Sequence, residues 1–76
     1  MRYYFDIHDG EEYTDDATGM ECASLDDMRR EAIAVLPSIA VEKLPDGNDR
    51  LFWVKVRDAN GRFIFQASLQ LKTEVL

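Results

Sequence analysis

Apolar and polar side chains alternate in three stretches of this 76-residue chain, and each stretch predicts a β-strand. The first covers residues 3–8, and the two strongest cover residues 51–57 and 62–72. In the first stretch, one face carries only apolar side chains, namely Tyr3, Phe5 and Ile7. A tight Asp9-Gly10 turn is followed by the polar residues 11–14, which predict a short return strand that completes a hairpin.

A single amphipathic helix is predicted between residues 25 and 43. Ser24 suits its start, because a serine hydroxyl accepts a hydrogen bond from an amide of the first helical turn. The apolar stripe consists of Leu25, Met28, Ala32, Val35, Leu36 and Ile39, with Ile33 and Ala40 at its margin. Pro37 falls on the polar side, where it predicts a bend that keeps the stripe covered. A loop at Pro45-Asp46-Gly47-Asn48 is expected to follow the helix.

The last two strands are joined by Asp58-Ala59-Asn60-Gly61, which is the strongest hairpin signal in the chain. An even loop sets Phe52, Val54 and Val56 opposite members of the series Phe63, Phe65, Ala67 and Leu69, whereas a three-residue loop mixes apolar with polar positions. We therefore predict an α+β fold formed by one domain, residues 1–76. It is a two-layer sandwich in which an antiparallel sheet of about four strands, in the order β-β-α-β-β, carries one helix on one face.

The sheet face opposite the helix is predicted to be amphipathic and to include an aromatic patch. Its members are Tyr4, Leu51, Trp53 and Ile64, and we interpret them as a possible protein interface. The alternative is that residues 73–76, or the stems of Lys55 and Arg57, shield Trp53 from solvent.

Length and cysteine content change the picture in two ways. A domain of this size buries only about 60% of the surface that its unfolded chain exposes, so we expect it to gain stability as a homodimer. Cys22 is the only cysteine, so no disulfide can form within the chain, and this composition fits the cytoplasm. No apolar run of signal-peptide or membrane-span length is visible, so we expect neither export nor a membrane contact.

The net charge of -6 is distributed unevenly along the chain. Residues 1–27 hold nine acids against Arg2 alone, whereas residues 28–76 hold eight basic and six acidic residues. This balance disfavours direct binding to nucleic acid and favours a basic protein partner. The predicted acidic surface consists of Asp9, Glu11, Glu12, Asp15 and Asp16.

Candidate chemical groups are few. His8 and Cys22 are the only histidine and cysteine, so a structural zinc site cannot be completed from these residue types in one chain. A nucleophilic pair would require the two to meet beside an orienting group, and no local pattern indicates this. The acids of residues 6–12 suggest a metal site, but their spacing differs from that of a calcium loop. We predict no catalytic residue, metal ligand or cofactor.

The opening Arg2-Tyr3-Tyr4-Phe5-Asp6-Ile7-His8-Asp9-Gly10 resembles an uncharacterised family of small bacterial proteins, a domain of unknown function whose members begin R-Y-F-F-D-I-H-D-G. The segments Leu44-Pro45-Asp46-Gly47 and Val56-Arg57-Asp58-Ala59-Asn60-Gly61-Arg62 agree with this family. Tyr4 replaces the usual Phe, and Pro37 within the helix is atypical. The resemblance implies fold boundaries and no activity. The element order is also similar to that of the partial nuclease-fold domains of certain antitoxins.

Three functional hypotheses follow. The first is a non-catalytic cytoplasmic protein-interaction module that self-associates. The second is an acidic inhibitor or antitoxin-like regulator whose acids imitate nucleic-acid charge at a basic protein site. The third is a small metal-dependent hydrolase, which would need a closed polar pocket around His8.

Overall fold

The computed structural model describes residues 1–44 and 49–76 of the chain. Its elements are β1 (Arg2–His8), β2 (Tyr13–Thr14), β3 (Met20–Glu21), α1 (Leu25–Lys43), β4 (Arg50–Arg57) and β5 (Phe63–Leu71). One helix and an antiparallel sheet confirm the predicted α+β fold. The loop predicted at residues 45–48 lies outside the described residues.

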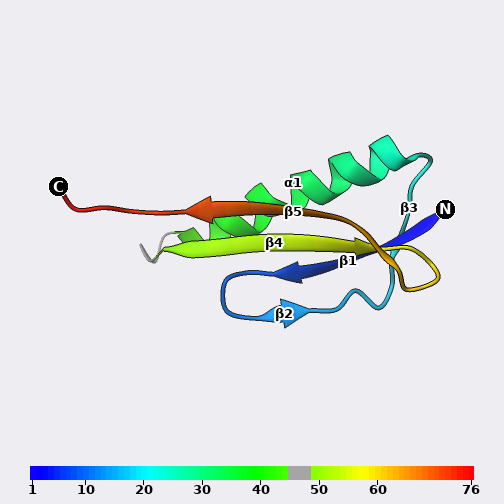
Figure 1. The fold of residues 1–76 in the computed structure, drawn as a ribbon, viewed down its shortest axis with the longest axis horizontal. Coiled ribbons are helices and arrows are strands. Elements are labelled where there is room, and N and C mark those ends of the chain that lie inside the picture. The colour runs from blue at the N-terminus through cyan, green and yellow to red at the C-terminus, as the bar shows by residue number, and fades with distance from the viewer. Residues whose placement is uncertain (45–48) are drawn as a thin grey trace.

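The sheet runs in the order β2-β1-β4-β5, and β3 pairs with the start of β1 (Figure 1). The return strand predicted over residues 11–14 is shorter than expected, because only Tyr13 and Thr14 pair with β1. The extended residues after Gly19 form β3, so the sheet has five strands where about four were predicted. Both short strands lie along one edge of β1, and β5 lies at the far side of the sheet.

The core confirms the predicted faces and the apolar pairing expected of an even loop, although the loop itself is odd: the Asp58 amide donates to the Arg62 carbonyl, which leaves residues 59–61 between them. Phe52 pairs with Leu69, Val54 with Ala67 and Val56 with Phe65, and the three β4 side chains are fully buried. The register then shifts between Val56 and Arg57, which pairs with Phe63, so that Ile64 forms a bulge. Bulges of this kind end regular pairing near a hairpin turn.

Helix α1 begins as predicted, since the backbone amide of Asp27 donates to the Ser24 hydroxyl over 3.1 Å. The buried side chains of the helix are Met28, Ala32, Leu36 and Ala40. Leu25 was assigned to the stripe but is 60% exposed. The reason is that a helical side chain covers the turn that precedes it, and no helical turn precedes the first residue. The helix continues through Pro37, whose ring is exposed as predicted; the bend stays a prediction.

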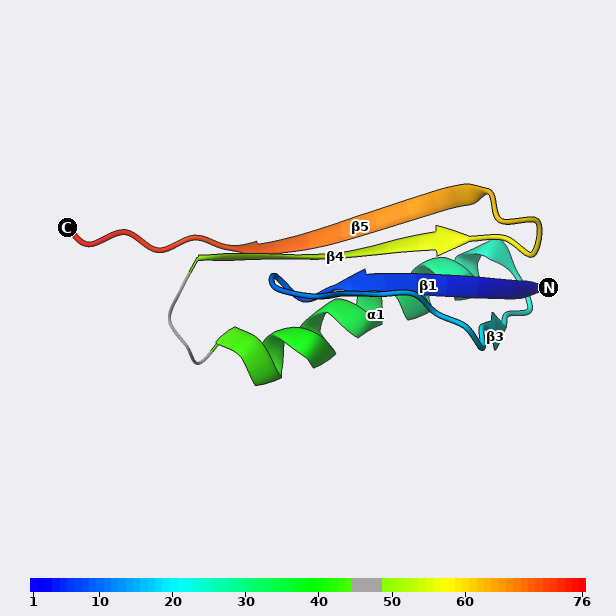
Figure 2. The same ribbon diagram turned by 90° about the horizontal axis from the view of Figure 1, so that it is seen from below.

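The helix lies on one face of the sheet and packs mainly on β4 and β5 (Figure 2). Tyr3 and Cys22 are buried with it, whereas Phe5 and Ile7 of β1 remain half-buried. The sheet therefore has one face covered by α1, an opposite face covered by no helix, and two edges of different character.

Candidate functional site

The β1–β2 hairpin is fixed by hydrogen bonds to its own backbone. Asp9 accepts from the amides of Glu11 and Glu12, both over 2.9 Å, and these bonds hold the pKa of Asp9 below its usual value. Arg50, at the start of β4, is buried and donates to the Asp9 carbonyl and to the Glu11 carboxylate over 3.2 Å each. Gly10 is required here, because its φ is 96° and an added Cβ would lie 2.3 Å from the Arg50 side chain.

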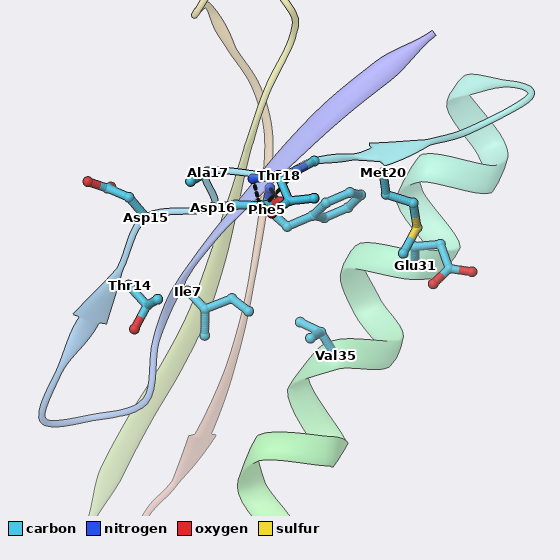
Figure 3. A pocket seen from close by; sticks show the side chains of 11 residues that line it. Phe5, Ile7, Thr14, Asp15, Asp16, Ala17, Thr18, Met20, Glu31 and Val35 are labelled. Atoms are coloured by element: carbon cyan, nitrogen blue, oxygen red, sulfur yellow. Dashed lines mark hydrogen bonds between the residues drawn. The ribbon is translucent and has the colours of Figure 1, made fainter.

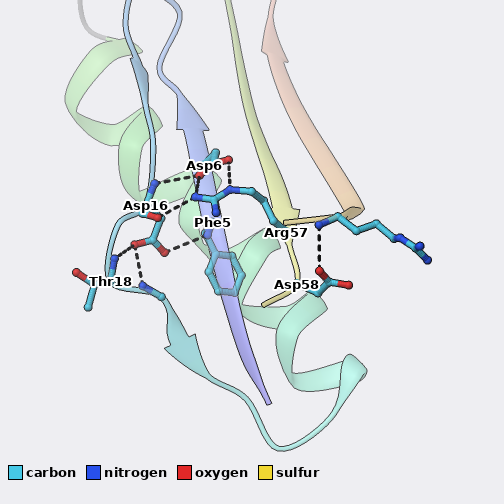
Figure 4. Close-up of polar contacts among 8 residues, drawn as sticks. Phe5, Asp6, Asp16, Thr18, Arg57 and Asp58 are labelled. Carbon is cyan, nitrogen blue, oxygen red and sulfur yellow. Dashed lines mark hydrogen bonds and ion pairs between the residues drawn. The ribbon is translucent and has the colours of Figure 1, made fainter. Parts of the chain in front are cut away.

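In the gap between β2 and β3 along β1, the Asp16 carboxylate takes the place of a paired strand. Asp16 accepts from the amide of Phe5 in β1 and from the amides of Thr18 and Gly19, each over 3.0 Å (Figure 4). Burial alone would raise the pKa of Asp16, but these three bonds outweigh it and leave the pKa below its usual value. The middle of the β1 edge is therefore closed by a side chain.

The same loop covers a buried ion pair on the sheet face opposite the helix. Asp6 is 1% exposed and accepts from two nitrogens of Arg57, over 2.8 and 3.0 Å. The Asp16 amide also donates to Asp6, and Arg57 donates to the Asp16 carbonyl, both over 2.9 Å (Figure 4). The Arg57 guanidinium holds the pKa of Asp6 below its usual value, against the raising effect of burial. From the sequence, Asp6 was considered only among the acids of residues 6–12 and Arg57 only as a possible shield for Trp53, and their pairing was not predicted.

Trp53 lies on the sheet face opposite the helix, as predicted, but its ring contacts differ from those expected. It stacks on His8 with ring centroids 5.2 Å apart, and Tyr13 lies 5.4 Å away. The Lys55 ammonium is 4.8 Å from the indole, so the stem of Lys55 partly shields it. A hydrogen bond to Asp15 raises the pKa of Tyr13 to about 12.

The other predicted interface residues differ in exposure. Leu51 and Ile64 are exposed, whereas Tyr4 is half-buried beneath the Arg57 guanidinium, 5.0 Å from its ring. The cation–π contact therefore covers one member of the predicted patch.

His8 and Cys22 are far apart in the fold. His8 ends β1, stacks on Trp53 and accepts from the Gly10 amide at Nδ1 over 3.0 Å. Cys22 lies beside the opposite end of β1, where its amide donates to the Met1 carbonyl, and burial raises the pKa of its thiol. Within residues 1–44 and 49–76, no three His, Cys, Asp or Glu side chains are arranged to hold a metal ion.

A pocket of about 490 Å³ separates the helix from the β1 edge (Figure 3). Phe5 and Ile7 line it from the sheet, Val35 and Glu31 from the helix, and Met20 from β3. This pocket exists because the helix packs mainly on the other half of the sheet. Most of its lining area is apolar, and the predicted acids Asp15 and Asp16 also border it.

The outer side of β5 was not singled out from the sequence as a site. Leu69 is 40% exposed although it belongs to the face on which the helix packs, whereas Phe63, which is 55% exposed, pairs with Arg57 and so lies on the opposite face. Ile33, which lies one helical turn after Arg29, is 49% exposed, and Arg29 lies over the Phe65 ring, 5.8 Å from its centroid. Exposed apolar side chains therefore occur on both faces of β5, and those on the helix side are Leu69 and, on α1, Ile33. The uninterrupted lack of charge in residues 63–71 was the signal that could have indicated them.

Comparison with known proteins identifies a family. The model of a domain of unknown function, DUF6894, matches residues 2–70. No match was found among curated proteins or among solved structures. In the described residues, no helix is long and apolar enough to cross a membrane.

Proposed function

We propose that this chain, which belongs to the DUF6894 family, is a protein-interaction module that binds a second copy of itself. The observation that carries this proposal is the set of exposed apolar side chains beside β5, namely Leu69 and Ile33 on the helix side and Phe63 on the opposite face. Clustered apolar side chains at a surface are typical of protein interfaces, because their burial removes apolar area from water. The small core adds to the argument, since a 76-residue domain gains stability by association.

The role we propose is non-catalytic. His8 and Cys22, the residue types most often used as base and nucleophile, are held at opposite ends of β1. The hairpin carboxylates of Asp9 and Asp16 accept hydrogen bonds from backbone amides. These contacts support structural roles for groups that a hydrolase would need to gather in one pocket. The single, buried Cys22 also supports a reducing compartment, and we propose the cytoplasm.

Self-association is tested by sedimentation velocity of the full chain at a series of concentrations up to tens of micromolar. We expect a monomer–dimer equilibrium in which the dimer fraction rises with concentration. Trp53→Ala, on the face opposite the helix, tests the aromatic patch and should leave the dimer intact if the β5 side forms the interface. A monomer at every concentration would contradict the proposal.

The acidic hairpin supports a second candidate, binding to a basic protein site. The structure gives the five predicted acids different surroundings: Asp9 and Asp16 accept from backbone amides, Glu11 pairs with Arg50, Asp15 bonds Tyr13, and the Glu12 side chain is exposed. The observation that favours this candidate is the ordered hairpin, which presents negative charge at a fixed edge of the sheet.

Capture of basic proteins by the immobilised chain tests this second candidate. Glu12→Gln with Asp15→Asn should weaken capture, whereas the matched helix variant Asp26→Asn with Glu42→Gln, which removes the same charge elsewhere, should not. Equal capture by both variants would indicate non-specific attraction and would contradict a hairpin site.

A further inference from the structure

Two hydrogen bonds elsewhere in the sheet show which backbone groups of β5 face outward. The Phe5 amide points away from β4, because it donates to Asp16. Backbone groups of neighbouring residues point to opposite sides of an antiparallel strand. The β1–β4 and β4–β5 pairings extend this alternation from Phe5 to β5. The N–H groups of Gln66, Ser68 and Gln70 therefore point to the outer edge of the sheet. The Thr73 amide, which donates to Asp49 just before β4, confirms that the odd positions face inward.

Beyond the bulge at Ile64, this outer edge lacks the features that usually protect an exposed strand. Edge strands are commonly short, or carry a charge or a proline that prevents pairing with another chain. Residues 63–71 contain neither a charged residue nor a proline, and β5 is the longest strand described. In the described part of the chain, β4 is the strand that pairs with β5, so the other side of β5 is unpaired (Figure 1).

We propose that β5 pairs antiparallel with β5 of a second copy, in the register centred on Ser68. This inference rests on the proposed self-association and names its geometry. In this register Ser68 faces its own counterpart, Gln66 faces Gln70, Ala67 faces Leu69, and Phe65 faces Leu71. The sheets of the two copies become one, and both helices lie on the same face because the two-fold axis is perpendicular to the sheet.

The pairing pattern favours a second copy as the occupant. Antiparallel pairing of even positions with even positions keeps apolar side chains on the helix face, where Leu69 and Phe65 gain apolar neighbours from the partner strand. The paired segment, residues 65–71, also lies outside the bulge at Ile64. A strand that matches itself in this way needs no second kind of chain.

The distribution of charge also favours pairing through the β5 edge and the register centred on Ser68. The acid-rich residues 1–27 form or flank the opposite edge of the sheet, so pairing at β5 keeps the two negative segments apart. Centring on Ser68 brings Glu74 toward the hairpin loop that holds Arg62, whereas centring on Ala67 would bring Lys72, a like charge, toward it.

Ser68→Pro tests the pairing directly, because it removes the central outward N–H while leaving the inward bonds to β4 in place. We expect the dimer dissociation constant, measured by sedimentation, to rise at least about tenfold, since the two-fold axis repeats the lost bond. Ser68→Ala is the matched control, which keeps the N–H and should retain the dimer. Circular dichroism at equal concentration shows whether each variant keeps its fold.

A second variant keeps the proposal open to refutation if Ser68→Pro fails to fold. Ser68→Cys places two thiols at the axis, and a short bismaleimide should crosslink them far more than in Gln70→Cys, whose two copies lie four positions apart across the register. A dimer that withstands Ser68→Pro, or equal crosslinking of the two cysteine variants, would overturn edge pairing and leave self-association standing through another surface. A wild-type chain that stays monomeric would overturn both.

Discussion

The two edges of the sheet differ in the features that decide whether a strand pairs with another chain. At the β1 edge, β2 and β3 supply two paired residues each, and the Asp16 carboxylate takes up the Phe5 amide between them. The β5 edge is nine residues long, uncharged and flanked by exposed apolar side chains. A small domain can thus close one sheet edge with loop side chains and keep the other available for association.

The loop that closes the β1 edge is bonded to a buried charge, the Asp6 carboxylate. Asp6 is 1% exposed, so it is stable only while Arg57 and the Asp16 amide satisfy its oxygens. Among the described residues, no buried ion pair holds β5, whose helix side is contacted by apolar side chains and by Arg29 over the Phe65 ring.

Removing the cation should damage the closed edge most. Arg57→Met leaves Asp6 buried without its ion-pair partner, and we expect the free energy of unfolding to fall by about 3 kcal/mol. Urea denaturation measures this loss, and Lys72→Met, an exposed position, should change it by less than about 0.5 kcal/mol. Similar values for the two variants would show that the buried pair does not stabilise the fold.

Removing the Asp16 carboxylate should open the same edge with a smaller loss. Asp16→Ala removes the hydrogen-bond acceptor of three backbone amides, those of Phe5, Thr18 and Gly19. We expect the free energy of unfolding to fall by about 2 kcal/mol. The exchange rate of the Phe5 amide with solvent should rise more than that of Val54. The neighbouring Asp15→Ala serves as the control. Unchanged exchange at Phe5 would contradict the proposed edge closure.

Acid should weaken the folded chain. Among residues 1–44 and 49–76, five carboxyl groups have a pKa below the usual value in the folded protein: Asp6, Asp9, Asp16, Glu21 and Asp49. The unfolded chain therefore binds protons first as the pH falls through about 4, so this stabilisation is complete above that pH and is lost below it. The urea midpoint should be lower at about pH 3 than at pH 7, and the difference should shrink in Asp16→Ala. A midpoint that is constant across this range would refute the linkage.

The smallest expected effect concerns the register at the open edge. Arg62→Glu should weaken the dimer about threefold by bringing two acids near each other, and Glu74→Arg should act similarly by bringing two bases near each other. The double variant restores opposite charges and should recover the wild-type dissociation constant in sedimentation. Additive weakening in the double variant would argue against the register centred on Ser68.

Much of the fold could be predicted because single-residue patterns encode it. The alternation of Phe52, Val54 and Val56 identified the buried face, and Ser24 marked the helix start. Asp6 and Arg57 were missed as a pair because they lie 51 positions apart and meet only through the β1–β4 register. One signal was present: an aspartate within a strand is disfavoured and therefore needs a compensating partner.

The candidate site was predicted less well, because surface roles depend on what neighbouring loops cover. Tyr4 belonged to the predicted patch but lies under Arg57, and Trp53 contacts His8 and Tyr13. The strand order placed β5 at an edge, a property that alternation alone does not encode. Absence of charge in residues 63–71 became informative only once that position was known.

Amide exchange of the wild-type chain at two concentrations is the most direct test of the account. Pairing through β5 predicts that the amides of Gln66, Ser68 and Gln70 become protected from exchange as concentration rises. The amides of Ala67 and Leu69, which face β4, should be protected at both concentrations. Equal exchange of Gln66, Ser68 and Gln70 at low and high concentration, in a sample that sedimentation shows to be dimeric, would contradict pairing through β5.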